Sequence, residues 1–214
     1  MRVHLTLQGK GGVGKSFVSA LLAQYLIDKG GAPTCIDTDP VNCTFSEYKA
    51  FGAKRIELLN GSRINERNFD QLMELIFNQE EDDFVVDSGA STFVPLSNYL
   101  VENRAVEMLV EAGKEVIVHP VVTGGQALFD TLNGLDSLAT QFSKSAGIIV
   151  WLNEYFGDII HDNKPFESMK IYQKHRERLS GIVRIPRQNP DTFGRDVEEM
   201  LNSKLTFAEA IGKI

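Results

Sequence analysis

The chain has 214 residues, of which 43% are hydrophobic and 24% are charged, and its formal net charge is −7. These values fit one soluble α/β domain, and the acidic balance argues against a surface coated for nucleic-acid binding. The two cysteines, Cys35 and Cys43, fit neither a zinc site nor a disulfide scaffold, which indicates a reducing compartment. Because the sequence shows no signal peptide and no window long enough to span a membrane, we expect a cytoplasmic protein.

Runs typical of strands and helices alternate along the chain. Short apolar or alternating runs predict strands at residues 3–8, 34–38, 55–59, 84–87, 115–120, 147–152 and 182–185. The spacing of apolar residues predicts helices at residues 15–29, 45–51 (one or two turns), 67–78, 94–113, 126–142 and 166–179. A capped helix opening at Asn189 and Pro190 and a capping box at residues 206–209 complete the series.

This alternation predicts right-handed βαβ units, and therefore a three-layer α/β/α fold around a mainly parallel sheet. One domain is expected to span residues 1–214. Ligands of such sheets bind beyond the carboxyl ends of the strands. The expected tips on that edge follow Gln8, Asp37, Val86, Val118, Leu152 and Ile185.

The strongest motif lies where the first strand meets the first helix. Residues 9–16, GKGGVGKS, fit the phosphate-binding pattern GxxxxGK[ST] in the strand–loop–helix context that the pattern requires. Inward-facing amides and the positive end of the helix attract phosphate oxygens, so we expect binding of ATP with Mg²⁺. Lys15 is expected to reach the β- and γ-phosphates, and Ser16 to ligate Mg²⁺. The expected nucleotide-binding positions are Gly9, Lys10, Gly11, Gly12, Val13, Gly14, Lys15, Ser16 and Phe17.

The additional lysine, Lys10, makes this loop resemble the deviant Walker A motif of the ParA/MinD family of P-loop ATPases. The resemblance covers nearly the whole chain, with the motifs in the same order. It implies a P-loop NTPase fold and a nucleotide-dependent homodimer in which Lys10 contacts the phosphates held by the partner subunit. A cation placed there stabilises charge in the transition state. The alternative is that Lys10 only adds positive charge to its own loop.

Two strand ends supply carboxylates. The segment DTDP at residues 37–40 resembles the family's DxDP segment, and the resemblance makes Asp39 the group that orients or deprotonates the attacking water. It also places Asp37 in or beneath the magnesium shell. DxDP is equally a good turn sequence, and residues 41–42 are Val-Asn where partition proteins often carry Gln-Gly. Asp87 ends an apolar strand in the Walker B pattern and is a candidate magnesium ligand.

Contacts to the base are expected from later strand ends. In the resembling family an asparagine at the place of Asn153 bonds the adenine edge, for which an amide offers both a donor and an acceptor. An asparagine that caps the following turn is the alternative. Pro186 matches a strand-end proline whose loop lines the base. Phe17 stands where many relatives carry Thr or Ser toward the α-phosphate, so that contact is lost or passes to the backbone.

The other features carry weaker signals. His119 is expected to be a plain strand-end histidine, with a partner contact as the alternative. Glutamates interrupt the basic residues of the predicted helix 166–179, and the tail 207–214 is short and mixed in charge. Direct DNA or membrane binding is therefore not supported.

Residues 3–16 and 204–211 resemble TraL-type proteins of plasmid conjugal-transfer regions. The resemblance implies an accessory ATPase of plasmid transfer that switches by ATP-dependent dimerisation and is read by an unidentified protein partner. Two alternatives remain: a small-molecule kinase or ligase on a similar fold, and a non-catalytic nucleotide-sensing module. For the ATPase, the expected catalytic residues are Lys10, Lys15 and Asp39, and the expected magnesium ligands are Ser16, Asp37 and Asp87.

Overall fold

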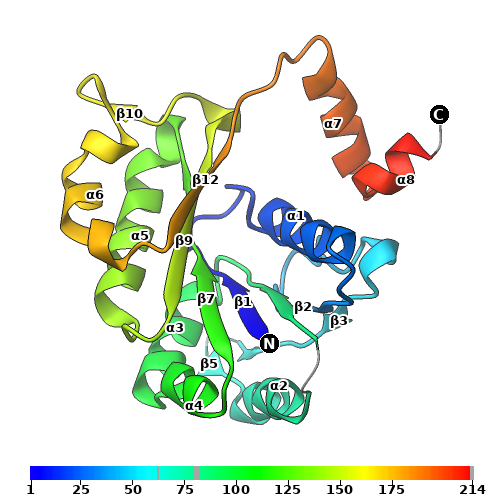
Figure 1. Cartoon of the computed structure of the whole chain (residues 1–214), viewed down its shortest axis with the longest axis vertical. Coiled ribbons are helices and arrows are strands. Elements are labelled where there is room, and N and C mark those ends of the chain that lie inside the picture. Colours follow the sequence, from blue (N-terminus) through cyan, green and yellow to red (C-terminus); the bar gives the residue numbers. More distant parts are fainter. Residues whose placement is uncertain (62, 80–81, 213–214) are drawn as a thin grey trace.

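The computed structural model describes residues 1–61, 63–79 and 82–212, and it shows a sheet with helices on both faces (Figure 1). The strand order is β12-β9-β7-β1-β6-β2-β3, with β8 beside β9, and every pairing in this sheet is parallel. The strands are β1 (Arg2–Thr6), β2 (Thr34–Asp37), β3 (Lys54–Arg55), β6 (Phe84–Asp87), β7 (Glu115–His119), β8 (Val121–Thr123), β9 (Gly147–Asn153) and β12 (Gly181–Ile185). The predicted α/β class with a mainly parallel sheet is confirmed.

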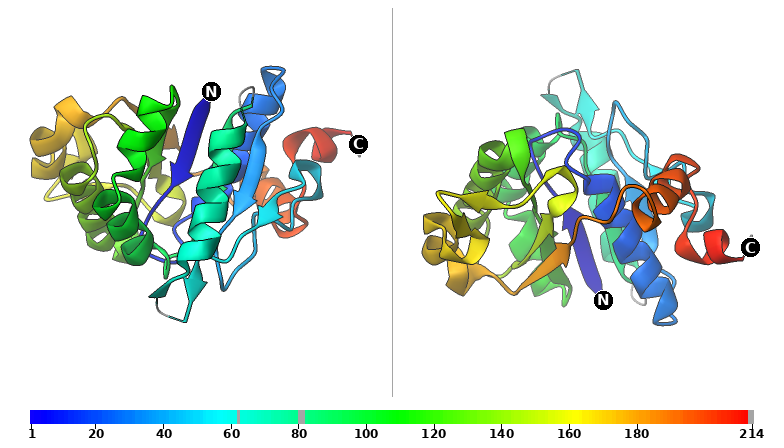
Figure 2. Two further views of the ribbon diagram at one scale, coloured as in Figure 1. Left: turned by 90° about the horizontal axis from the view of Figure 1, so that it is seen from below. Right: turned by 90° about the horizontal axis from the view of Figure 1, so that it is seen from above.

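The helices divide between the two faces of the sheet, and α1 lies on the face opposite α2, α3 and α4 (Figures 1 and 2). Side chains of β1 point alternately to the two faces of the sheet. Val3 and Leu5 pack in the core under α2 to α4, while Thr6 faces α1 and its hydroxyl oxygen accepts a hydrogen bond from the Ser19 hydroxyl. The helices are α1 (Lys15–Asp28), α2 (Glu66–Asn78), α3 (Phe93–Glu102), α4 (Ala105–Glu111), α5 (Leu128–Gln141), α6 (Lys170–His175), α7 (Phe193–Asn202) and α8 (Phe207–Ile211).

Short elements fill the connections. Two small antiparallel hairpins pair β4 (Leu59–Asn60) with β5 (Arg63–Ile64) and β10 (Ile160–His161) with β11 (Lys164–Pro165). Five single turns of 3-10 helix are described: η1 (Lys49–Phe51), η2 (Gly125–Ala127), η3 (Glu154–Phe156), η4 (Phe166–Ser168) and η5 (Arg176–Arg178). The strand predicted at residues 55–59 was therefore wrong at residues 56–58, which connect β3 with β4, and β8 was not predicted.

Three helix predictions were also wrong. The helix predicted at 94–113 is two helices, because Arg104 adopts a left-handed conformation (φ 50°) and begins a new turn. The helix predicted at 166–179 is broken into η4, α6 and η5, and its buried Phe166 fastens it to the core. Asn189 does not open a helix; its side chain accepts the amide of Asp191, and α7 begins at Phe193.

The C-terminal capping box is confirmed, with the side chains of Thr206 and Glu209 each accepting the other residue's amide at the start of α8. The end of the predicted tail, residues 213–214, lies outside the described residues. Within the described ranges, every helix is too short or too polar to cross a bilayer.

Candidate nucleotide-binding site

The loop between β1 and α1 lies at the carboxyl edge of the sheet, and its glycines are required by its geometry. Gly12 and Gly14 have positive φ angles of 73° and 101°. A Cβ at Gly14 would lie 2.7 Å from Nδ2 of Asn153, and one at Gly9 would lie 2.9 Å from the Phe93 ring. The loop thus takes a conformation and a packing that side chains at these positions would prevent.

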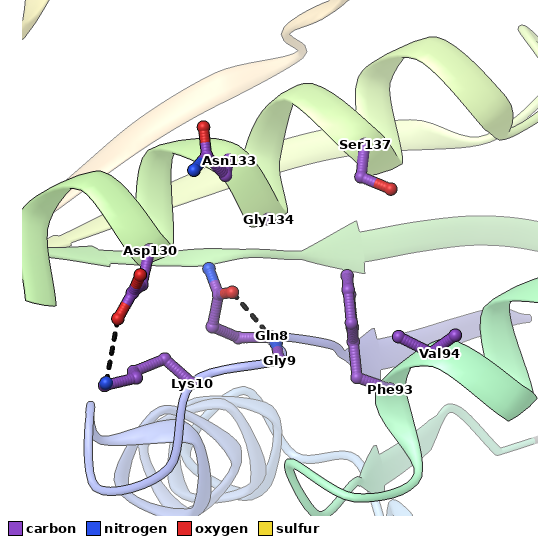
Figure 3. A pocket seen from close by; sticks show the side chains of 9 residues that line it. All are labelled: Gln8, Gly9, Lys10, Phe93, Val94, Asp130, Asn133, Gly134 and Ser137. Atoms are coloured by element: carbon purple, nitrogen blue, oxygen red, sulfur yellow. Dashed lines mark hydrogen bonds and ion pairs between the residues drawn. The ribbon is translucent and has the colours of Figure 1, made fainter.

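The two lysines of the loop have different environments. Lys15 is 7% exposed, and its Nζ donates to the carbonyl of Lys10 at 3.0 Å. Burial lowers the pKa of Lys15, while the carboxylates of Asp87 and Asp39 act in the opposite direction. The Lys10 side chain is half-exposed and forms a 2.8 Å ion pair with Asp130 of α5 (Figure 3). Lys15 is therefore fixed inside the loop, whereas Lys10 lies on the surface.

Asp87 is completely buried at the end of β6, beneath the loop. Its Oδ1 accepts the Ser19 hydroxyl at 2.9 Å, while its Oδ2 is buried without a hydrogen bond within the described part of the chain. Burial raises the pKa of Asp87 to about 7, although the hydroxyls of Ser16 and Ser19 favour the charged form. A buried carboxylate oxygen with free lone pairs beside a hydroxyl is a donor set that suits Mg²⁺.

The carboxylates of Asp37 and Asp39 organise the loop after β2. The two oxygens of Asp37 accept the amides of Asp39 at 3.0 Å and of Ser46 at 2.9 Å. Oδ1 of Asp39 accepts the amides of Val41 at 2.9 Å and Asn42 at 3.1 Å. The DTDP segment therefore forms a turn held by its own carboxylates, which is the alternative that the sequence offered for it.

A cavity of about 590 Å³ opens in front of the phosphate loop, within the usual size of small-molecule sites. The loop after β2 and the start of the segment after β6 form two of its walls. The third wall was not predicted: Leu201, Asn202 and Lys204, from the end of α7 and the turn after it, complete the cavity. Its lining includes Gly11, Gly12, Gly14, Lys15, Ser16, Phe17 and Asp39, and thus unites most of the predicted phosphate and catalytic residues.

Asn153 and Pro186 lie outside the lining of this cavity. The Asn153 side chain donates from Nδ2 to the carbonyl of Val13 at 2.9 Å and accepts the amide of Tyr155 at Oδ1. It therefore caps the turn after β9, as the alternative interpretation expected, and also braces the phosphate loop. These two bonds use one N–H and one oxygen lone pair of the amide, which leaves its second N–H and its second lone pair outside them. Pro186 follows β12 and is exposed.

Gln8 is a supporting residue that the sequence motifs did not reveal. Its side chain is fully buried, and Nε2 donates to the carbonyls of Val121 at 2.9 Å and Thr131 at 3.1 Å. Its Oε1 accepts the amide of Gly9 at 2.9 Å (Figure 3). Gln8 thus ties the first residue of the loop to β8 and α5. A polar residue between a buried strand and a glycine loop was the only sequence signal.

His119 is a buried structural histidine, as the preferred interpretation expected. Nε1 of Trp151 donates to Nδ1 of His119 at 2.9 Å, which places the proton of His119 on Nε2, 2.9 Å from Nδ1 of His4. Nε2 of His4 then carries a proton that is buried without an acceptor in the described ranges. Burial lowers the pKa of His4 to about 4 and that of His119 to about 3.

A family model for the CobQ/CobB/MinD/ParA nucleotide-binding domain matches residues 5–188. The chain belongs to this family. Two Escherichia coli relatives, each called Protein TraL, are 52% and 50% identical to this MinD/ParA-family chain over 210 residues, covering 98% of it and 87% of each relative. The predicted family and its TraL-like branch are therefore confirmed.

Solved structures agree with the family assignment at the level of the fold. A plasmid partition protein from Borrelia burgdorferi B31 bound to AMPPNP has a TM-score of 0.51 at 16% identity, covering 99% of this chain and 94% of that one. An iodide-soaked crystal of a Borrelia burgdorferi partition protein has a TM-score of 0.50 at 16% identity, covering 94% and 97%. The predicted P-loop fold is thus confirmed.

Proposed function

We propose that this MinD/ParA-family chain is a magnesium-dependent ATPase that acts as an ATP-dependent dimerisation switch. One observation carries the proposal: the buried amine of Lys15 and the loop glycines line one cavity, and the fully buried carboxylate of Asp87 lies close enough to interact with Lys15 and Ser16 of that lining. This combination offers cationic and amide donors to a polyphosphate and oxygen ligands to its metal ion.

The residues beneath the loop fit a bound Mg²⁺. Oδ2 of Asp87 and the Ser16 hydroxyl are the proposed ligands, because the first is a buried oxygen without a hydrogen bond in the described residues and the second lines the cavity. Asp37, whose two oxygens already accept amides, is proposed to serve from the outer shell of the ion. When bound, the ion neutralises charge that develops on the phosphates.

Asp39 and Lys10 are the proposed catalytic groups beside Lys15. In the described residues only Oδ1 of Asp39 accepts backbone amides, which leaves Oδ2 to orient a water at the cavity. Among the described residues, the Lys10 amine is held by an exposed ion pair with Asp130, and such pairs contribute about 0–1 kcal/mol. Lys10 can therefore leave this pair to contact a nucleotide in a partner subunit.

The similarity to the TraL proteins supports a role as an accessory of plasmid conjugal transfer, in the cytoplasm and with a protein partner that reads the nucleotide state. The AMPPNP in the Borrelia burgdorferi partition protein supports an adenine nucleotide as the ligand. Asn153 and Pro186 would contribute to the base site only after a local rearrangement, since neither residue lines the cavity.

A non-catalytic nucleotide sensor is the second candidate, and a specific observation favours it: Asp39 already closes its own turn with two hydrogen bonds. Sedimentation with ADP, ATP and a non-hydrolysable analogue, together with phosphate release, separates the candidates. The switch predicts dimers with ATP and the analogue and phosphate release to water; the sensor predicts binding without release. Transfer of phosphate to an added metabolite would instead indicate a kinase or ligase.

The matched variants for this experiment are Lys15→Ala and Lys29→Ala. Lys15→Ala removes the buried amine of the loop and is expected to abolish nucleotide binding, whereas Lys29 lies at the exposed end of α1 and its variant should bind like the wild type. Retained ATP affinity in Lys15→Ala would contradict the proposed site.

A further inference from the structure

The C-terminal arm, defined here as residues 193–212 with α7 and α8, reaches back to the nucleotide cavity. Figure 1 places both helices beside α1, and the amide of Phe207 donates to the Gln24 side chain of α1 at 2.7 Å. Leu201, Asn202 and Lys204 of the arm line the same cavity as Ser16 and Phe17. The arm is thus a wall of the candidate site.

Lys204 has a backbone conformation that side chains rarely adopt. Its φ angle is 54°, in the left-handed region, and it follows α7 at the position where glycine usually ends a helix. Its amide bonds the carbonyl of Leu201, and the amide of Leu205 bonds the carbonyl of Met200, which completes the usual glycine-type helix ending. Lysine is strained at this position where glycine is not, and strained residues cluster at ligand sites, where the side chain has a use.

The charges around the cavity suggest that use. Lys15 and Lys204 are the cations of its described lining, and Asp39 is the anion. Phe17 stands beside Ser16 at the entrance to α1, and a phenyl ring offers phosphate no hydrogen bond. The Nζ of Lys204 is 3.4 Å from Oε2 of Glu47, whose side chain is 58% exposed, so the pair is long and solvated. A polyphosphate competes well for such an amine.

We propose that Lys204 is a second phosphate-binding lysine of this cavity, and that Glu47 holds it until a nucleoside di- or triphosphate enters. The inference rests on the proposed function and adds a residue and a contact to it. Lys204 exchanges the Glu47 carboxylate for a phosphate oxygen on the Phe17 side of the loop. Because Glu47 belongs to the loop that Asp37 and Asp39 organise, nucleotide binding changes the link between that loop and the arm.

The test measures equilibrium binding of ATP, ADP and adenosine to the full chain and its variants. Lys204→Gln is expected to weaken ATP and ADP binding about 10-fold and to leave adenosine binding unchanged, because a charged hydrogen bond to phosphate is lost. Glu47→Gln is expected to tighten ATP binding by roughly 2- to 5-fold, because the competing carboxylate is gone. The control variants are Arg195→Gln and Glu199→Gln, which break an exposed ion pair on the same arm. They should leave the affinities for ATP, ADP and adenosine unchanged.

Two further features keep the test decisive. Lys204→Gly fits the left-handed position, so it should fold at least as stably as the wild type and still lose the ATP affinity. Unchanged ATP affinity in Lys204→Gln, or weakening of ATP binding in both Lys204→Gln and Glu47→Gln, would overturn the inference, since the second result means that the ion pair is only structural. A wild type that binds no nucleotide would contradict the proposed function and the inference with it.

Discussion

Gly134 of α5 offers a test of how the phosphate loop is supported. A Cβ on Gly134 would lie 2.1 Å from Oε1 and 2.9 Å from Nε2 of Gln8, so Gly134→Ala must displace the buried Gln8 amide. That amide makes hydrogen bonds to the amide of Gly9 and to the carbonyls of Val121 and Thr131. The substitution therefore reaches the loop through Gln8 without touching a residue that lines the nucleotide cavity.

The magnitude follows from these three bonds. Their net loss is worth roughly 3 kcal/mol, at about 1 kcal/mol for each buried bond. Alanine in a helix returns about 1 kcal/mol relative to glycine. The free energy of unfolding is therefore expected to fall by about 2 kcal/mol, which lowers Tm by roughly 4–8 °C in a domain of this size. ATP affinity should also fall, because the first amide of the loop is no longer held.

Denaturant and thermal unfolding, with ATP titration, measure both effects. Asn133→Ala is the matched control, because Asn133 is the exposed residue of α5 that precedes Gly134, and both residues line the pocket drawn in Figure 3, which is separate from the nucleotide cavity. In a double-mutant cycle with Gln8→Ala, the cost of Gly134→Ala should largely disappear, since the clashing amide is absent. The reasoning is refuted if Gly134→Ala is as stable as Asn133→Ala. It is also refuted if Gly134→Ala destabilises the Gln8→Ala variant as much as it destabilises the wild type.

Three further predictions concern the chemistry and the buried core. Asp39→Ala should bind ATP, lose phosphate release and accumulate as dimer in sedimentation, and wild-type turnover would exclude its water-orienting role. Lys10→Ala should bind ATP near the wild-type affinity yet dimerise poorly, and an undiminished dimer with the non-hydrolysable analogue would show that Lys10 stays in its own subunit. Because the pKa values of His4 and His119 are low in the folded protein, the unfolded state binds more protons than the folded state below about pH 6.5. The free energy of unfolding is therefore highest above that pH and decreases as the pH falls toward 4. For each histidine, the free energy of unfolding should fall by roughly 2 kcal/mol between about pH 7 and pH 5. Denaturant titrations at the two pH values measure the summed decrease, and His4→Leu should about halve it. If His4→Leu left the pH dependence of the free energy of unfolding unchanged, the buried neutral pair would be contradicted.

The features read correctly from sequence are those that local chemistry decides. The loop from Gly9 to Ser16 needs particular residues at particular positions, and its glycines at 12 and 14 do have positive φ angles. The strand ends at Asp37 and Asp87 were placed correctly, because short buried strands have a distinct composition. The capping box at the start of α8 is likewise a contact between near neighbours in sequence.

The errors occurred where distant segments decide the outcome. The apolar period of residues 94–113 runs through Arg104, yet the chain turns there and packs two helices on the sheet. The base contact predicted for Asn153 stays a prediction, and the bond from its amide to Val13, which is 140 positions away, was not predicted. Neither result can be read from periodicity, since both depend on which surfaces meet after the sheet has formed.

The sequence alone determined the phosphate loop, the parallel α/β plan and the acidic strand ends, because each depends on residue type and spacing within a few positions. Only the tertiary structure decided that Gln8 supports Gly9, that Lys10 pairs with Asp130, and that Lys204 closes the cavity. The partners that fix these side chains lie far away in the sequence, such as Val121 and Thr131 for Gln8 and Asp130 for Lys10, so they meet only when the layers pack.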